Sequence, residues 1–348
     1  MAVGPELPAA AGGGTGIGAT TANTAYALLA FLAHGETPAS PEFGETVEGA
    51  IRWLVENQRP GGIWDSRGKS GAYANPAATY ALAEAYGMTK IPSIRPAVEA
   101  GLDVIIKGQN PSGGWDYGLN PSSTRNDSSI NSWCCQALKA AQMAGIERPG
   151  LEKAIQNAIR GWKANFGHGG SDTSGGGFGY SGPGRAGAIL SGAGILSLQL
   201  LGAGESEEVK RALHSHNERR EFVFDASYRR TYQHYYDTQA RFHEGGEGWR
   251  EWNRKFSVPL VNAQTVIPNG IADLQGRMVD IGYWCNNNGP AGRVMDTALC
   301  ALQLMVYYRY LPTFQSPEQI LAADGGDEAV ADQPRIVEAQ DLDIEIQL

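Results

Sequence analysis

The sequence is poor in cysteine, and the few cysteines it has are not spaced as a disulfide framework. There are four in 348 residues: Cys134, Cys135, Cys285 and Cys300. Small secreted domains held by disulfides carry many more, at regular spacings. The adjacent pair would form a strained bridge. We therefore predict four reduced thiols and exclude a disulfide-stapled scaffold.

Basic clusters are also missing, which excludes the class of proteins that bind nucleic acid through a basic face. The formal net charge is −9. Most of it lies in 313–348, which contains nine acidic residues and a single Arg335. We interpret this segment as an acidic, partly disordered tail that offers a surface to a protein partner.

Long hydrophobic runs are rare, and the one uncharged segment that could pass for a membrane span is rich in glycine. It covers residues 186–204 (AGAILSGAGILSLQLLGAG). Its length would allow a membrane span, but its glycines, serines and glutamine favour a helix buried inside a larger helical protein. Residues 1–14 contain no basic and apolar segments of a signal peptide. We expect them to be flexible, and we read this start as lying inside a longer polypeptide, so no compartment is assigned.

Glycine is abundant, and part of it belongs to an internal repeat. The chain has 46 glycines, about twice the usual share of roughly 7%. GAIRWLVENQRPGGIW (49–64) and AGLDVIIKGQNPSGGW (100–115) share a Gln followed by Gly-x-Trp. Gln58 and Gln109 are 51 residues apart, and so are Trp64 and Trp115. A repeat of this length predicts one supersecondary unit used several times.

The hydrophobic periodicity predicts two alternating kinds of helix. Apolar helices rich in small residues are expected at 20–34, 73–87, 127–145, 186–203, 229–245 and 293–311. Amphipathic helices are expected at 45–58, 93–108, 150–164, 206–219 and 247–263. Glycine-rich loops join each amphipathic helix to the next apolar one. The only strand we expect is DLDIEIQL (341–348). The predicted fold class is all-α, an α/α toroid over 15–312 in which the apolar helices form an inner ring around a central cavity.

The repeat resembles the QW motif of squalene cyclases and related triterpene cyclases. Trp53-Leu54-x3-Gln58-x3-Gly62-x-Trp64 is the fullest copy, with Glu48 where a basic residue is usual. The second copy has Val104 at the aromatic position, and later copies are reduced to Gly177-Phe178 and to Gln264 with a distant Gly282-x-Trp284. The chain also resembles the broader prenyltransferase/squalene-oxidase-repeat proteins through 234–256 and 297–312. The resemblance implies the toroid fold and structural roles for the Gln and Trp residues.

The chemistry of that superfamily is only partly represented. Cyclases place a strong acid in a D-x-D-D-T-A motif, but this chain reads Arg293-Val294-Met295-Asp296-Thr297-Ala298. Met295 therefore stands where the proton donor would be. Prenyltransferases bind zinc through Asp-x-Cys and a later His, but this chain has no Asp-x-Cys, and no His follows Cys285 or Cys300. We expect no metal and no cofactor. If the chain is an enzyme, the resemblance implies a terpene cyclase, an isomerase, or a prenyltransferase-like transferase.

Three side chains are the candidate catalytic residues. His234 and Asp237 are three residues apart and share a helix face, and Asp296 begins the last apolar helix. Together they could act as general acid and base. The structural alternative is that Asp296 caps its helix and that Asp237 orients His234 by a hydrogen bond.

Aromatic residues near loop–helix junctions are the candidate substrate-binding residues: Trp115, Trp133, Tyr180, Tyr235, Tyr236 and Trp284. Aromatic faces stabilise carbocations and hold apolar chains, so an isoprenoid or another apolar small molecule is the expected ligand. The alternative is that these rings fill the core.

Two further functions remain open. One is a non-catalytic scaffold that binds a protein through the tail, through a strand added by 341–348, or through the insertion 265–281. The other is an (α/α)6 polysaccharide lyase or hydrolase, which would need carboxylates across an open cleft.

Overall fold

The computed structural model describes residues 17–64, 68–167, 176–184, 188–219, 221–224, 228–273, 276–285, 292–308 and 313. The predicted flexible segment 1–14 and the predicted tail beyond Thr313, with its strand at 341–348, lie outside these residues. Within them the chain is mostly helical, as predicted.

Six helices correspond to the predicted apolar set, and five to the predicted amphipathic set. The first are α1 (Ile17–Ala33), α3 (Gly68–Thr89), α5 (Ser128–Met143), α7 (Ala188–Leu200), α9 (Tyr228–Glu244) and α11 (Gly292–Met305). The second are α2 (Gly44–Glu56), α4 (Arg95–Gly108), α6 (Leu151–Asn165), α8 (Glu207–Arg219) and α10 (Gly246–Asn262). The alternation follows the predicted order throughout the described residues.

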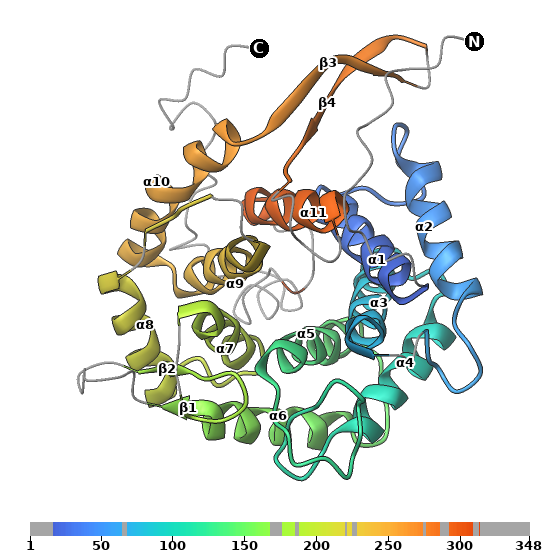
Figure 1. Cartoon of the computed structure of the whole chain (residues 1–348). Helices are drawn as coiled ribbons and strands as arrows, with labels where there is room; N and C mark the ends of the chain where they lie inside the picture. Colours follow the sequence, from blue (N-terminus) through green and yellow to red (C-terminus); the bar gives the residue numbers. More distant parts are fainter. Residues whose placement is uncertain are drawn as a thin grey trace, which may run out of the picture.

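The odd-numbered helices pack in succession, and the last returns to the first. α1 contacts α3, α3 contacts α5, and the series continues through α7 and α9 to α11, which contacts α1. Figure 1 looks down this closed arrangement and shows the even-numbered helices around its outside. The odd-numbered helices are covered on most sides, which explains why the sequences of all of them except α9 carry few charges.

Each even-numbered helix presents one apolar stripe to the odd-numbered ones. In α2 the buried side chains are Val47, Ile51 and Leu54, and in α4 they include Val98, Leu102 and Ile105. Spacings of three and four place such residues on one helix face. The uncharged segment 186–204 contributes α7, which packs against α5 and α9. No helix among the described residues is long and apolar enough to cross a membrane.

The first two copies of the Gln–Gly-x-Trp repeat make the same contacts. The Trp64 and Trp115 indole nitrogens donate to the carbonyls of Leu54 and Ile105, each at 2.7 Å. The Gln58 and Gln109 amides donate to the carbonyls of Ala97 and Ala154, each at 2.9 Å. The Trp therefore fastens its loop to the preceding outer helix, and the Gln fastens it to the following one.

The glycine of this motif is required by a close approach of two backbones. Gly62 and Gly113 have φ of 82° and 92°. A Cβ on Gly62 would lie 2.2 Å from the Ala100 oxygen, and one on Gly113 would lie 2.1 Å from the Asn157 oxygen. No side chain fits there, and only glycine adopts this conformation without strain.

A second contact extends the repeat to copies that the sequence shows only in part. The main-chain N–H groups of Trp64, Trp115, Phe178 and Trp284 donate to side chains early in the next inner helix, those of Asn75, Asn131, Ser191 and Thr297. These four distances run from 2.8 to 3.3 Å. Phe178 is fully buried at the tryptophan position. The same main-chain contact is therefore made even where the residue types of the repeat have changed.

The insertion 265–281 forms a hairpin, so our prediction of a loop without strands is wrong there. β3 (Thr265–Ala272) pairs antiparallel with β4 (Met278–Tyr283), and the register shifts between Ile267 and Ile271. Pro268 and Gly270 mask the strand signal, because both residues are typical of turns. The actual turn is closed by Asp273 N–H to the Arg277 carbonyl at 2.8 Å.

The base of this hairpin brings together the residues of the last Gln–Gly-x-Trp copy. Thr265 pairs with Tyr283, and a Cβ on Gly282 would lie 2.3 Å from the Gln264 amide nitrogen. The Trp284 indole nitrogen donates to the Leu260 carbonyl at 2.8 Å, at the end of α10. Gln264 and Gly282 are far apart in sequence, but the hairpin brings them together, as the short loops do for the Gln and Gly of the first two copies.

Two two-residue strands, β1 (Phe166–Gly167) and β2 (Gly177–Phe178), pair antiparallel beside α6.

All four cysteines are free thiols, as predicted, and three of them are buried.

Candidate functional site

One tryptophan and four tyrosines meet in the interior of the helix ring. Trp133 of α5 lies 5.0 Å from Tyr26, 6.4 Å from Tyr80, 5.7 Å from Tyr235 and 6.1 Å from Tyr236, between ring centroids. Tyr26 is on α1, and Tyr235 and Tyr236 are on α9. Neither helix is adjacent to α5 in the ring, so these contacts cross its interior. All five rings are buried.

Hydroxyl and amide groups cross the interior between the same helices. Ser132 Oγ donates to Tyr236 Oη at 2.9 Å, and Gln136 Nε2 donates to Tyr235 Oη at 2.8 Å. Both bonds join α5 to α9. Burial raises the pKa of Tyr236 well above its usual range and that of Tyr235 to about 12, so these phenols stay protonated at neutral pH.

A carboxyl group that we did not single out from the sequence lies at this centre. Glu84 of α3 is fully buried. Its Oε1 accepts a hydrogen bond from Thr313 Oγ1. Burial raises the pKa of the Glu84 carboxyl to about 8, and the bonds from Thr313 offset only part of that rise. The sequence did carry a signal, because Glu84 is the only charged residue between Lys69 and Lys90.

The predicted substrate-binding residues divide between this centre and the loops. Trp133, Tyr235 and Tyr236 lie together in the interior. Trp115 and Trp284 lie in the loop contacts described above, with their indole nitrogens bonded to outer-helix carbonyls.

Tyr180 lies at a rim beside the start of α5 and is 43% exposed. Its hydroxyl meets that of Tyr117 in a short hydrogen bond. The Arg125 guanidinium lies over the Tyr180 ring, 5.0 Å from its centroid, and is paired with Asp127 at 2.8 Å. Asp127 caps α5 by accepting from the Ser129 N–H. These residues form an ordered polar rim at one end of the ring.

His234 points away from the centre, towards α10. Its ring lies 4.6 Å from that of Phe222 and 5.7 Å from that of Trp252, between centroids. Its Nε2 donates to the Val223 carbonyl at 3.2 Å. This contact ties the incoming loop to an inner helix, as Asn75 does for the loop at Trp64. Its catalytic role stays a prediction.

Asp237 is buried between α9 and α7. Its Oδ2 accepts from Gln233 Nε2 at 3.0 Å and lies 3.8 Å from His234 Nδ1. A Cβ on Gly192 would lie 2.2 Å from Asp237 Oδ1. The structure thus brings His234 and Asp237 near each other, at a distance longer than a hydrogen bond.

Asp296 lies on α11, which packs against α9. It is buried, and its charge adds to the burial that raises the pKa of the Cys300 thiol. Cys300 belongs to a second apolar cluster with Trp252 and Trp284. Asp296 therefore lies between α11 and α10.

Within the described residues, no group of three or more His, Cys, Asp or Glu side chains could hold a metal ion. The chain matches no protein-family model, no curated protein and no solved structure in the comparisons made with them.

Proposed function

We propose that the helix ring is an α/α toroid of the terpenoid-cyclase and prenyltransferase-repeat kind, and that its centre binds a ligand with an apolar, isoprenoid-like body. The observation that carries this is the cluster around Trp133, to which α1, α3, α5 and α9 each contribute an aromatic ring. Aromatic faces bind unsaturated and branched hydrocarbon chains without requiring charge. The QW-like contacts support the fold assignment, since they anchor the loops in the way the resemblance implies.

The test is retention and conversion of isoprenoids by the purified protein. We would incubate it with squalene, with C15–C20 prenyl alcohols and with prenyl diphosphates, remove free ligand, extract with solvent and analyse by gas chromatography and mass spectrometry against a boiled control. We expect retained isoprenoid. Its absence for every compound would contradict the proposal.

A matched pair of variants tests whether the ligand binds at the central cluster. Trp133 and Trp162 are both fully buried, but Trp162 donates to the Cys135 thiol at 3.3 Å and packs on Phe178. Trp133→Leu should abolish retention, whereas Trp162→Leu should lose stability but keep the ligand. Equal loss in both would indicate a binding site outside the central cluster.

Catalysis is a separate question. If a new product forms, Asp237→Asn and Asp296→Asn test the predicted acid and base. Full turnover in both variants would remove these two residues from the mechanism.

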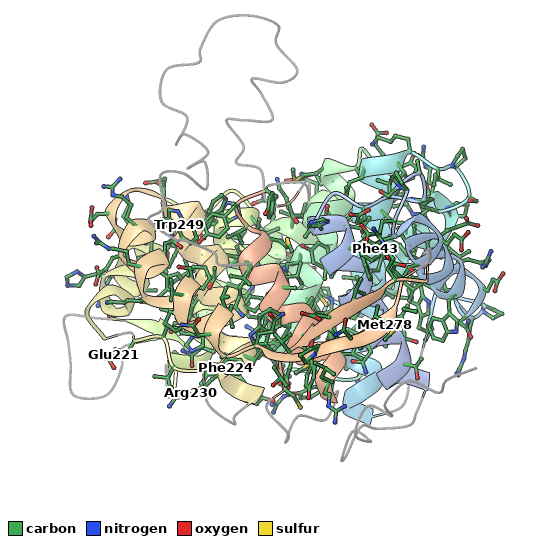
Figure 2. All side chains as sticks on the ribbon, turned by 90° about the horizontal axis from the view of Figure 1, so that it is seen from above. Phe43, Glu221, Phe224, Arg230, Trp249 and Met278 are labelled. Carbon is green, nitrogen blue, oxygen red and sulfur yellow. The ribbon has the colours of Figure 1, made fainter. Side chains whose placement is uncertain are left out.

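A protein-interaction module is the second candidate, and the β3–β4 hairpin favours it. Val266, Ile271 and Met278 are each about half exposed, at 49, 54 and 50%. Figure 1 shows the hairpin extending away from the helices, and Figure 2 marks Met278 on β4. Each strand has one edge outside the pair, which an extended segment of a partner could join.

A variant in which a short Gly-Ser turn joins Gln264 to Gly282 would test this candidate. A partner that forms a stoichiometric complex with the intact chain, as purified components, and not with this variant would support it. Equal complex formation by both would contradict it.

A further inference from the structure

The ring centre contains a hydrogen-bonding site that the aromatic cluster alone does not explain. Glu84 and Gln136 are both at least 99% buried, on α3 and α5. Each keeps one oxygen, Glu84 Oε2 and Gln136 Oε1, without a hydrogen-bond partner among the residues the structure describes. Buried polar atoms without partners cost folding free energy, so two in one interior indicate a ligand group that bonds them.

The two side chains share their neighbours. Gln136 Nε2 donates to Tyr235 Oη at 2.8 Å. Burial raises the pKa of both Tyr80 and Tyr235, and the nearby Glu84 charge adds to the rise in each. Glu84, Gln136, Tyr80 and Tyr235 therefore surround one region inside the ring.

The polarity of this region suits a neutral oxygen. With its pKa raised to about 8, Glu84 is largely protonated at neutral pH and can donate as well as accept. Among the described residues, the hydrogen bonds that Glu84 accepts come from Thr313, and no Lys or Arg side chain donates to it. A diphosphate would bring several negative charges into this region, where the part of the chain that the structure describes places no cation on Glu84.

The chain itself supplies the group that identifies the ligand. Thr313, which follows α11, is 2% exposed. Its hydroxyl lies 2.9 Å from Tyr80 Oη and donates to Glu84 Oε1. The threonine side chain is an alcohol carbon that bears a methyl group, so a hydroxyl attached to hydrocarbon is bound here within the protein.

We propose that Glu84, Tyr80 and Gln136 bind the hydroxyl group of an otherwise apolar, isoprenoid-type alcohol. In the ligand-free chain Thr313 occupies the part of this site formed by Glu84 Oε1 and Tyr80 Oη, and leaves Glu84 Oε2 and Gln136 Oε1 for the ligand. This inference rests on the proposed function for the apolar body of the ligand. It adds that the polar end is a neutral alcohol and not a diphosphate.

The experiment compares geranylgeraniol, the C20 hydrocarbon that lacks its hydroxyl, and geranylgeranyl diphosphate. Affinities are measured by calorimetric titration from cyclodextrin on the full chain. We expect the alcohol to bind at least about tenfold more tightly than the hydrocarbon, the factor given by about one net hydrogen bond. The diphosphate should bind no more tightly than the alcohol.

Variants then test which residues cause the tighter binding of the alcohol. Glu84→Met should reduce the ratio of the two affinities to near one, and Glu84→Gln should keep most of it because the amide also donates and accepts. Gln136→Met, on another helix, should lower the ratio and covers a failure of Glu84→Met to fold. Thr313→Val should raise the affinity for the alcohol several-fold. Thr79→Val is the matched control, since the Thr79 hydroxyl donates within α3 to the Asn75 carbonyl and faces Gly101 of α4.

The outcomes separate the two proposals. Equal binding of alcohol and hydrocarbon by the unmodified chain overturns the hydroxyl site but keeps the apolar ligand. The same holds for a preference that persists in both Met variants, or for tighter binding of the diphosphate. If none of the three compounds binds, the proposed function itself fails, and the hydroxyl site fails with it.

Discussion

The loop tryptophans and the central tryptophan are all buried, but different contacts hold them. Trp64, Trp115 and Trp284 each donate to a carbonyl near the end of the preceding outer helix. Trp133 is surrounded by tyrosine rings from helices on several sides of the ring. The loop residues hold neighbouring elements together, whereas the central one also joins α5 to α1 and α9, which are not adjacent to it in the ring. The same residue type therefore holds the loops at one place and, in our proposal, contacts a ligand at the other.

The largest expected effect concerns the loop group. Trp115→Ala removes a fully buried ring and its hydrogen bond to Ile105. Truncating a buried aromatic residue costs about 3–5 kcal/mol of unfolding free energy. Urea denaturation measures it, with Val261→Ala as a control, because Val261 is 51% exposed and should change stability by no more than about 0.5 kcal/mol. A loss below about 1.5 kcal/mol would mean that the loop contacts do not hold the layers together.

The next effect concerns the centre and depends on pH. The folded pKa of Glu84 is about 8, whereas that of an unfolded glutamate is about 4.3. Between these values the folded chain binds one proton more, so the contribution of Glu84 is present below the lower pKa and is lost as pH rises towards 8. The slope is about 1.4 kcal/mol per pH unit. Tyr80 and Tyr235 ionise above this range because burial raises both pKa values.

The measurement is the difference in unfolding free energy between the unmodified chain and Glu84→Gln from pH 5 to pH 8.5. The variant should become relatively more stable as pH rises, by a few kcal/mol in total. A difference that does not change with pH would show that the Glu84 carboxyl is ionised in the folded chain, and the neutral character of the centre would then be wrong.

The next prediction compares two loop glycines, and its expected effect on stability is smaller. Gly61 and Gly113 have similar φ angles, 89° and 92°. A Cβ on Gly61 meets nothing within 4 Å, whereas one on Gly113 meets the Asn157 oxygen at 2.1 Å. Gly61→Ala should cost about 1 kcal/mol, from backbone strain alone. Gly113→Ala should cost about 2–3 kcal/mol, since the two backbones must also separate. Similar losses in thermal unfolding would mean that the close approach is readily relieved.

These regions differ in how well the sequence predicts them. The helices could be predicted because apolar spacing and the Gln-Trp repeat act locally, and the observed bounds mostly lie within a few residues of those expected. The hairpin could not, because Pro268 and Gly270 indicate a turn and the strand pairing depends on residues up to 18 apart in sequence, Thr265 with Tyr283.

Only part of the candidate site could be predicted from the sequence. Trp133, Tyr235 and Tyr236 could be selected as aromatic residues near loop–helix junctions, and they lie together in the structure. Glu84 was missed because a lone carboxylate in an apolar helix has meaning only when the other helices that enclose it are known. His234 and Asp237 were placed on one face from their spacing, but nothing in the spacing shows that His234 packs against Phe222 and Trp252 of the outer layer.

The smallest effect separates the rings of the central cluster from their hydroxyl groups. Tyr236→Phe removes the bond from Ser132 at 2.9 Å but leaves the ring contact with Trp133. Ser132 Oγ can still donate to the Ser129 carbonyl at 3.0 Å, so no donor is left without a partner and the cost should be about 1 kcal/mol. Binding of an isoprenoid hydrocarbon should not change, because its contacts are with ring faces. Denaturation and hydrocarbon titration of this variant, with the half-exposed Tyr308→Phe as control, decide the point. A hydrocarbon affinity that falls tenfold would show that the Tyr236 hydroxyl sets the geometry of the cluster, and the division between anchoring polar contacts and ligand-facing rings would then not hold at the centre.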